Sequence, residues 1–273
     1  MRIKDSIIRI WAWGSGLLVI SLVLYIFGYI LWRGWSSVSW EFLTDVPRGM
    51  ILGTEGGIAP AIMGSFLSTV IGCTTAGFFG ICTGVYLVFY AKNIKTVSAV
   101  HMVIRCIGGI PSIVLGLFGY TMFVLYLGLG KSIISGGLTL GIMIFPVVET
   151  RIERAFGDID QNMIRASYSL GVSKVYTIIK VVIPMCIREI ISALILAFGY
   201  AVGATAPIMF CMAVINSPVS MDITKPSMAL SYHLYILLTQ GISTEKAYGT
   251  AFVMMMLILV VIFFSQILLR RKR

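Results

Sequence analysis

The stretch DIDQNMIRASYSLGVSKVYTIIKVVIP, residues 158 to 184, is a polar interruption between two strongly apolar regions of the chain. Its residues are typical of two short helices joined by a tight turn. Asp158 or Asp160 can cap the first helix, and Gln161 stands three residues after Asp158, as in a capping box. Gly171 suits the left-handed conformation that ends a helix. The pattern therefore predicts that the first helix ends at this glycine.

A second short helix is expected between Ser173, which can cap it, and Pro184. It would place apolar side chains on one face: Val175, Ile178, Ile179 and Val182. An apolar stripe of this kind, exposed to water, favours a partner surface.

The rest of the chain is too apolar for a water-soluble domain. Its 273 residues are 58% hydrophobic and 12% charged, and the mean hydropathy is +0.97, whereas soluble domains carry roughly 25% charged residues. A hydrocarbon core of about 30 Å needs about 20 helical residues, and six uncharged runs are long enough to be membrane-spanning segments. The runs lie between Arg9 and Arg33, Glu55 and Lys92 (where Pro60 can open the helix), Arg105 and Lys131, Lys131 and Glu149, Glu189 and Asp222, and Lys246 and Arg270.

These runs are expected to be helices, because strand-type alternation is absent and a bilayer cannot satisfy open backbone groups. The sequence therefore predicts an all-α membrane protein with six transmembrane helices. We divide it into an N-terminal start and peripheral helix (1–33), an extracytoplasmic loop (34–57), a core (58–269) that includes a cytoplasmic loop (149–189), and a basic tail (270–273).

The basic residues predict the orientation. The net charge is +10, and most Lys and Arg fall on the side that holds both termini and the 149–189 loop. Basic residues are retained in the cytoplasm, so we expect both termini to be cytoplasmic and the charge to face anionic lipid rather than nucleic acid. The first apolar run is too long for a signal peptide and is interpreted as an uncleaved helix.

Small residues four apart recur in the apolar runs, as in the ladder Gly72, Ala76, Gly80 and Gly84 and the ladder Ala193, Ala197, Ala201 and Thr205. Such ladders let helix backbones approach closely in lipid. Two uses are open: packing inside one bundle, or contact with a partner subunit. The first helix differs, because its tryptophans favour a peripheral position facing lipid.

Residues for chemistry are scarce. The five cysteines form no CxxC pair and the chain has two histidines, so a metal site is not predicted. No GxxxxGK[ST] loop is present, so we expect no ATP hydrolysis and no bound cofactor. Tyr232, His233 and Tyr235 suit an interface or a re-entrant turn, and His233 is interpreted as a hydrogen-bonding residue rather than a proton carrier.

The 158–184 stretch resembles the EAA loop of the permease subunits of ABC importers. The family pattern is Glu-Ala-Ala, three residues, Gly, nine residues, Ile, one residue, Leu-Pro. This chain keeps the spacing but has Arg in place of Glu and Ser in place of the second Ala. The resemblance implies that the stretch docks in a groove of a cytoplasmic ATPase, through Arg165, Ala166, Ser167, Leu170, Gly171, Val181, Ile183 and Pro184.

Four further segments resemble the PstA type of phosphate-import permease. They are GGIAPAIMGS (56–65), GGIPSIVLGLFGY (108–120), GATAPIMF (203–210) and ALSYHLYILLTQGISTEKAYGTA (229–251). The resemblance implies a MetI-like bundle that forms half of a phosphate pathway. It implies as partners a PstC-type permease, two PstB-type ATPase subunits, which use ATP and Mg, and an extracytoplasmic PstS-type phosphate-binding protein.

The chain departs from the PstA pattern in its fifth span. The family reads Arg-Ala-Ile-Gly-Glu-Thr-Ala-Pro where this chain has Tyr200 and Ala204 at the two ionisable positions. Either the partner permease supplies the polar groups, or the cargo is another oxyanion such as sulfate, molybdate or phosphonate. Candidate pathway residues are Thr69, Pro111, Ser112, Tyr200, Gly203, Thr205 and Pro207.

Gly203 and Pro207 can serve as bending points or only permit close packing. Functions from other classes are a stand-alone secondary transporter or channel, and a membrane-embedded enzyme. A transporter would be expected to show intramembrane acids or an inverted repeat, and an enzyme a cluster of His, Asp or Glu; the sequence suggests neither.

Overall fold

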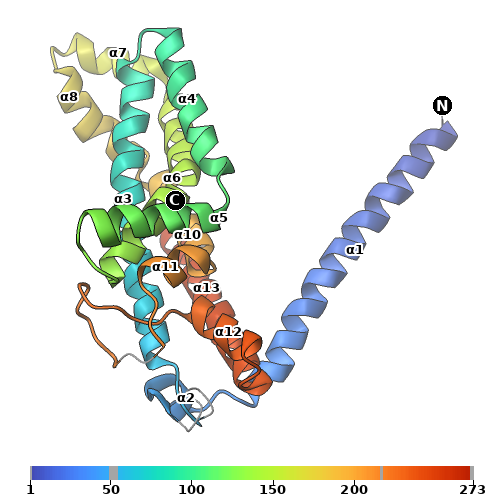
Figure 1. Ribbon diagram of the computed structural model, residues 1–273. Helices are drawn as coiled ribbons and strands as arrows, with labels where there is room; N and C mark the ends of the chain where they lie inside the picture. Colours follow the sequence, from blue (N-terminus) through green and yellow to red (C-terminus); the bar gives the residue numbers. More distant parts are fainter. Residues whose placement is uncertain (1, 49–54, 216–217, 271–273) are drawn as a thin grey trace.

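The computed structural model describes residues 2–48, 55–215 and 218–270 as a helical bundle, which confirms the all-α membrane class (Figure 1). Gly49 and Gly53 of the predicted loop and residues 271–273 of the predicted tail lie outside these ranges. In the described part, four single helices are long and apolar enough to cross a membrane, and two bent pairs bring the number to six. The four are α1 (Arg2–Trp35), α3 (Ala59–Val85), α6 (Ile133–Gly157) and α13 (Thr244–Arg270).

The first bent pair corrects the span expected between Arg105 and Lys131. Helix α4 (Ile94–Gly109) begins well before Arg105, and α5 (Ser112–Gly119) follows at an angle of 99°. Pro111 explains the break, because the residue before a proline is pushed out of the helical region, and Ile110 is extended at φ −73°, ψ 129°. The π-helical turn η2 (Tyr120–Tyr126) continues α5, which lies across the bundle in Figure 1.

The second bent pair corrects the span expected between Glu189 and Asp222. Lys174–Met185, made of α8 (Lys174–Thr177), the π-helical turn η3 (Ile178–Val182) and α9 (Ile183–Met185), meets α10 (Ile187–Val202) at 63°. Helix α10 then stops about 20 residues before Asp222. Gly203 caps its C-terminal end, and α11 (Ala206–Cys211) starts with Pro207 in its first turn, where a missing N–H is tolerated.

The core is built on the close pairing of α3 with α6, in which the α3 ladder packs inside the chain. A Cβ on Gly72 would meet Leu140 and the Gly137 backbone, one on Gly80 would meet Val148, and one on Gly84 would meet Phe156. Within the other ladder, Ala193, Ala197 and Ala201 are fully buried in the same core. Internal packing is therefore the use that the structure shows for both ladders.

Helix α1 stands apart from the bundle, as expected for a peripheral helix. Its tryptophans are exposed, and between Ile8 and Trp35 the one buried residue is Gly34, which lies against α13. It touches α13 near its C-terminal end, where the Tyr29 and Tyr248 ring centroids are 5.6 Å apart, and then diverges from the bundle (Figure 1). Both chain ends lie in the upper half of the figure, the half that holds α7 (Gln161–Ser169) and α8.

The end opposite α7 carries more regular structure than the expected irregular loop. Helix α2 (Trp40–Thr44) is capped by Ser39, and β1 (Pro47–Arg48) pairs antiparallel with β2 (Glu55–Gly56). Pro60 lies in the first turn of α3, as predicted. Nearby, α12 (Leu230–Thr239) packs on α13, where His233 Nδ1 lies 3.2 Å from Thr250 Oγ1.

Candidate functional site

The predicted helix–turn–helix of residues 158–184 is present. Asp160 caps α7 by accepting a hydrogen bond from the Asn162 N–H at 2.9 Å. Asp158 does not cap α7, because α6 continues to Gly157 and Asp158 ends that helix. Gly171 has φ +75°, and Ser173 caps α8 by accepting from the Tyr176 N–H at 3.3 Å.

Side chains tie the two short helices to each other and to the bundle. The Ser167 and Thr177 hydroxyl oxygens are 2.8 Å apart, so the Ser that replaces the family Ala joins α7 to α8. Lys174 Nζ donates a hydrogen bond to the Phe89 carbonyl and lies 4.2 Å from the Tyr90 ring centroid. These contacts attach the loop to the end of the α3 rod, which continues as the π-helical turn η1 (Tyr86–Tyr90).

The outer surface of this loop carries apolar side chains among polar ones, and the predicted stripe is divided between two faces. Ile178 and Val182 are buried against the bundle, whereas Val175 and Ile179 are exposed. Leu170, at the turn, is 81% exposed. Of the other family positions, Arg165, Ala166, Gly171 and Pro184 are exposed, and Ser167, Val181 and Ile183 are half-buried.

Four predicted pathway residues converge in one cavity of about 540 Å³ between α5, α6 and α10. They are Ser112, Tyr200, Gly203 and Thr205, with Pro111 just outside at the α4–α5 break. Tyr200 is 58% exposed, and Ala204 lines the same cavity. The two positions where the family has Arg and Glu therefore face this space.

Two predicted pathway residues do not reach the cavity. Thr69 is fully buried in α3, and its hydroxyl has no hydrogen-bond partner within the part of the chain that the structure describes. Pro207 is buried in α11. Gly203 is exposed, and a Cβ there would meet only the carbonyls of Tyr200 and Gly199, at 3.7 and 4.0 Å, so close packing does not explain this glycine.

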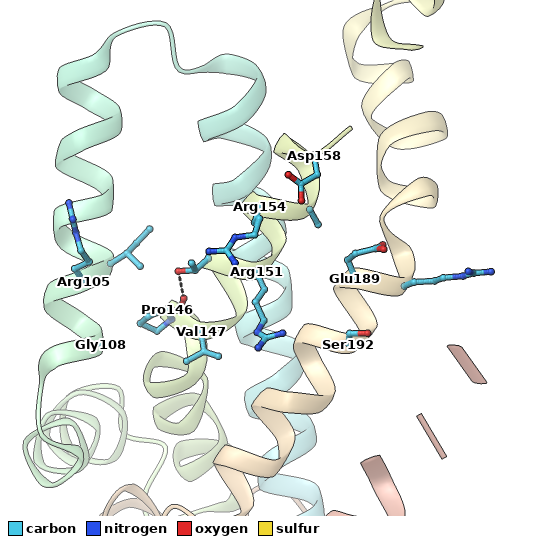
Figure 2. A pocket seen from close by; sticks show the side chains of 13 residues that line it. Arg105, Gly108, Pro146, Val147, Arg151, Arg154, Asp158, Glu189 and Ser192 are labelled. Carbon is cyan, nitrogen blue, oxygen red and sulfur yellow. Dashed lines mark hydrogen bonds between the residues drawn. The ribbon is translucent and has the colours of Figure 1, made fainter. Parts of the chain in front are cut away.

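A second cavity, of about 770 Å³, was missed by the sequence reasoning. It lies between α4, α6 and α10, next to the α7–α8 loop (Figure 2). Its charged lining consists of Arg105, Arg151, Arg154, Arg188, Asp158 and Glu189. The spacing of Arg151 and Arg154 was the available signal, since residues three apart share a helix face.

A cluster of titratable groups was also missed, on the far side of α6 from this cavity. His101 Nε2 lies 2.9 Å from both carboxylate oxygens of Glu153. Glu149, one turn earlier, is 1% exposed, and its Oε1 has no hydrogen-bond partner among the described residues. The sequence analysis did not bring these residues together, because α4 and α6 meet only in the folded chain.

Comparisons with known proteins identify the family. The family described as "Binding-protein-dependent transport system inner membrane component" matches residues 77–273. The "Probable ABC transporter permease protein YqgI" of Bacillus subtilis (strain 168) is 31% identical over 237 residues, which cover 82% of this chain and 80% of that protein. The "Phosphate transport system permease protein PstA 1" of Mycobacterium tuberculosis (strain ATCC 25618 / H37Rv) is 28% identical over 241 residues, which cover 87% of this chain and 78% of that protein.

Solved structures share the fold at low sequence identity. A bacterial ABC transporter involved in the import of the acidic polysaccharide alginate matches with a TM-score of 0.65 and 14% identity, over 100% of this chain and 99% of that chain. An inward-facing MetNI methionine ABC transporter matches with a TM-score of 0.63 and 16% identity, over 76% and 92%.

The bent six-span bundle and the loop on one of its ends thus define a class, the permease subunit of an ABC importer. The chain belongs to the binding-protein-dependent transport system inner membrane component family and is a multi-pass inner-membrane protein.

Proposed function

We propose that this chain is the permease subunit of an importer of inorganic phosphate and supplies half of the translocation pathway. The observation that carries the proposal is the similarity to phosphate permeases of the PstA type over 87% of the chain. The convergence of Ser112, Tyr200 and Thr205 in one cavity supports it, because these residues place hydroxyl groups where an oxyanion could pass.

The chain is the non-catalytic part of the complex. A PstB-type ATPase pair would use ATP and Mg and hold the exposed apolar surface around Leu170. A PstC-type permease would complete the pathway, and a PstS-type protein would deliver phosphate from outside. Both termini and the α7–α8 loop face the cytoplasm in this arrangement, which agrees with the distribution of Lys and Arg.

Uptake into vesicles tests the cargo. Vesicles that contain the full complex, the binding protein and ATP on the ATPase side should accumulate radiolabelled phosphate in preference to sulfate, molybdate or phosphonate. Preferred uptake of one of those ions would instead support the alternative cargo, which Tyr200 and Ala204 keep open. Solute uptake by the purified chain alone, without ATPase subunits, would contradict the ABC mechanism.

A matched pair of glycine variants tests the docking loop. A Cβ on either Gly171 or Gly157 would meet no atom within 4 Å, but only Gly171 has a positive φ. A β-branched residue at that φ costs roughly 1–2 kcal/mol, so Gly171→Val should distort the turn, weaken ATPase co-purification about tenfold and reduce uptake. Gly157→Val should change neither by more than about twofold. Equal behaviour of the two variants would show that the turn does not hold the ATPase.

A further inference from the structure

The basic cavity beside the α7–α8 loop combines charge from three helices. Arg105 comes from α4, Arg151 and Arg154 from α6, and Arg188 from α10. Two carboxylates, Asp158 and Glu189, lie in the same lining. The four guanidinium groups therefore outnumber the acidic groups in a volume of about 770 Å³.

Membrane topology alone does not explain this arrangement. Retention of basic residues on one side of a membrane depends on their number near the helix ends and not on the helix face they occupy. Here Val147, Thr150, Arg151 and Arg154 share the face of α6 that lines the cavity, whereas Val148 and Ile152 are buried in the core. The arginines thus line one open hollow on the surface of the bundle.

Arg151 and Arg154 of α6 have no ion-pair partner among the residues that the structure describes. Across residues 2–48, 55–215 and 218–270, the ion pairs join other residues, and none includes Arg151 or Arg154. Figure 2 shows both side chains projecting from α6 into the space between α4 and α10. Planar guanidinium groups match the oxygens of a phosphate group with paired donors.

The basic cavity and the cavity at Tyr200 have two helices in common, α6 and α10. On α6, Val147 of the first lies about one helical turn from Met143 of the second; on α10, Ser192 lies about two turns from Gly199. The two cavities therefore lie one after the other along α6 and α10, the first beside α4 and the second beside α5, and together they are called the groove.

We propose that Arg151 and Arg154, with Arg105 at the rim, form a binding site for a phosphate-type oxyanion at the loop end of this groove. The site supplies positive charge, which Tyr200, at the position of the family Arg, does not supply. It rests on the proposed function for the identity of its ligand. The same chemistry is offered by inorganic phosphate in transit and by the headgroup of an anionic phospholipid, and the test separates these two sources.

The test measures protection of a cysteine placed in the cavity. Val147→Cys is introduced into a background with Cys82→Ser and Cys106→Ser, and the full complex is assembled in lipid discs of phosphatidylcholine. The modification rate by an anionic thiol reagent is compared with that by a cationic one of similar size. Inorganic phosphate is then titrated, and in a second arm phosphatidylglycerol is added to the discs.

The expected result is faster modification by the anionic reagent and a slowing of both reactions by the ligand. Slowing by inorganic phosphate in phosphatidylcholine discs supports the site with the free ion as its source. Slowing only by phosphatidylglycerol supports it with the headgroup as its source. Slowing by neither would overturn the proposal.

Charge variants show whether the arginines are responsible. Replacing both Arg151 and Arg154 by Gln should raise the half-protecting concentration at least about tenfold and abolish the preference for the anionic reagent. Lys95→Gln removes an exposed charge from α4 outside the cavity and should change neither. Unchanged protection in the double variant would also overturn the proposal.

This readout is independent of transport. A complex that imports another ion but still shows arginine-dependent protection would contradict the phosphate function and leave the site standing. A complex that imports phosphate but shows no such protection would contradict the binding site and leave the phosphate function standing.

Discussion

At the scale of single residues, the glycines of this chain have distinct roles. Gly64 lies where α3 crosses the segment before α12, and a Cβ there would stand 2.0 Å from the Met228 carbonyl oxygen. That contact is with backbone, so a methyl group can be accepted only if the chain shifts. Gly203 stands at the C-terminal end of α10, where a Cβ would make only ordinary contacts, at 3.7 and 4.0 Å, with the carbonyls of Tyr200 and Gly199.

We predict opposite outcomes for alanine at these two glycines. Gly64→Ala should destabilise the fold by about 1–3 kcal/mol, as overpacking does, and lower the midpoint of thermal unfolding in detergent. Gly203→Ala should leave the midpoint within about 1 °C, or raise it slightly, because alanine reduces the entropy of the unfolded chain. A lower midpoint for Gly203→Ala than for Gly64→Ala would refute this assignment.

At the scale of elements, the α7–α8 loop is useful only if its movement reaches the bundle. Lys174 makes that link, through the Phe89 carbonyl and the Tyr90 ring. A charged hydrogen bond contributes about 1.5–3 kcal/mol, and a cation–π contact about 0.5–2 kcal/mol. The attachment is therefore strong for a single side chain.

Replacing Lys174 by Met should separate ATP hydrolysis from transport. The Met variant keeps an apolar stem but loses both polar contacts, so the phosphate imported per ATP hydrolysed should fall severalfold while the ATPase still co-purifies. Lys95→Met, at an exposed lysine of α4, is the matched control and should keep the wild-type ratio. If the ratio is the same in both variants, the link lies elsewhere in the loop.

At the scale of the whole molecule, both chain ends lie in the half that holds the α7–α8 loop, and α2 lies at the opposite end (Figure 1). Trp40 is 80% exposed on α2, and Gln161 is exposed at the start of α7. The distribution of basic residues predicts that the α7 end is cytoplasmic.

Thiol labelling of intact cells tests that orientation. Trp40→Cys should react with a membrane-impermeant reagent added outside, whereas Gln161→Cys should react only after permeabilisation. A fluorescent protein fused to the C-terminus should be fluorescent, because it stays in the cytoplasm. The reverse labelling pattern would show that the molecule is inserted the other way round.

Features that depend on a single residue could be predicted from the sequence, whereas features that depend on contacts between distant helices could not. The Gly171 turn and the Ser173 cap were predicted correctly because each follows from one residue's own conformation or hydrogen bond. The start of α4 at Ile94 was missed because Arg105 was used as a boundary, although a helix can carry charge beyond the lipid. The basic cavity could not be predicted, since α4, α6 and α10 meet only in the folded chain.

The close packing of α3 against α6 at their glycines also determines where the protein can change shape. At Gly72 and Gly141 the two helices are packed too closely to slide past each other. The two helices must therefore move together as one rigid unit. Bending is then left to the 99° joint at Pro111 and the 63° joint at Cys186. Both joints border the groove, so a change of angle at either one widens or narrows the groove without any change in the packing of α3 against α6.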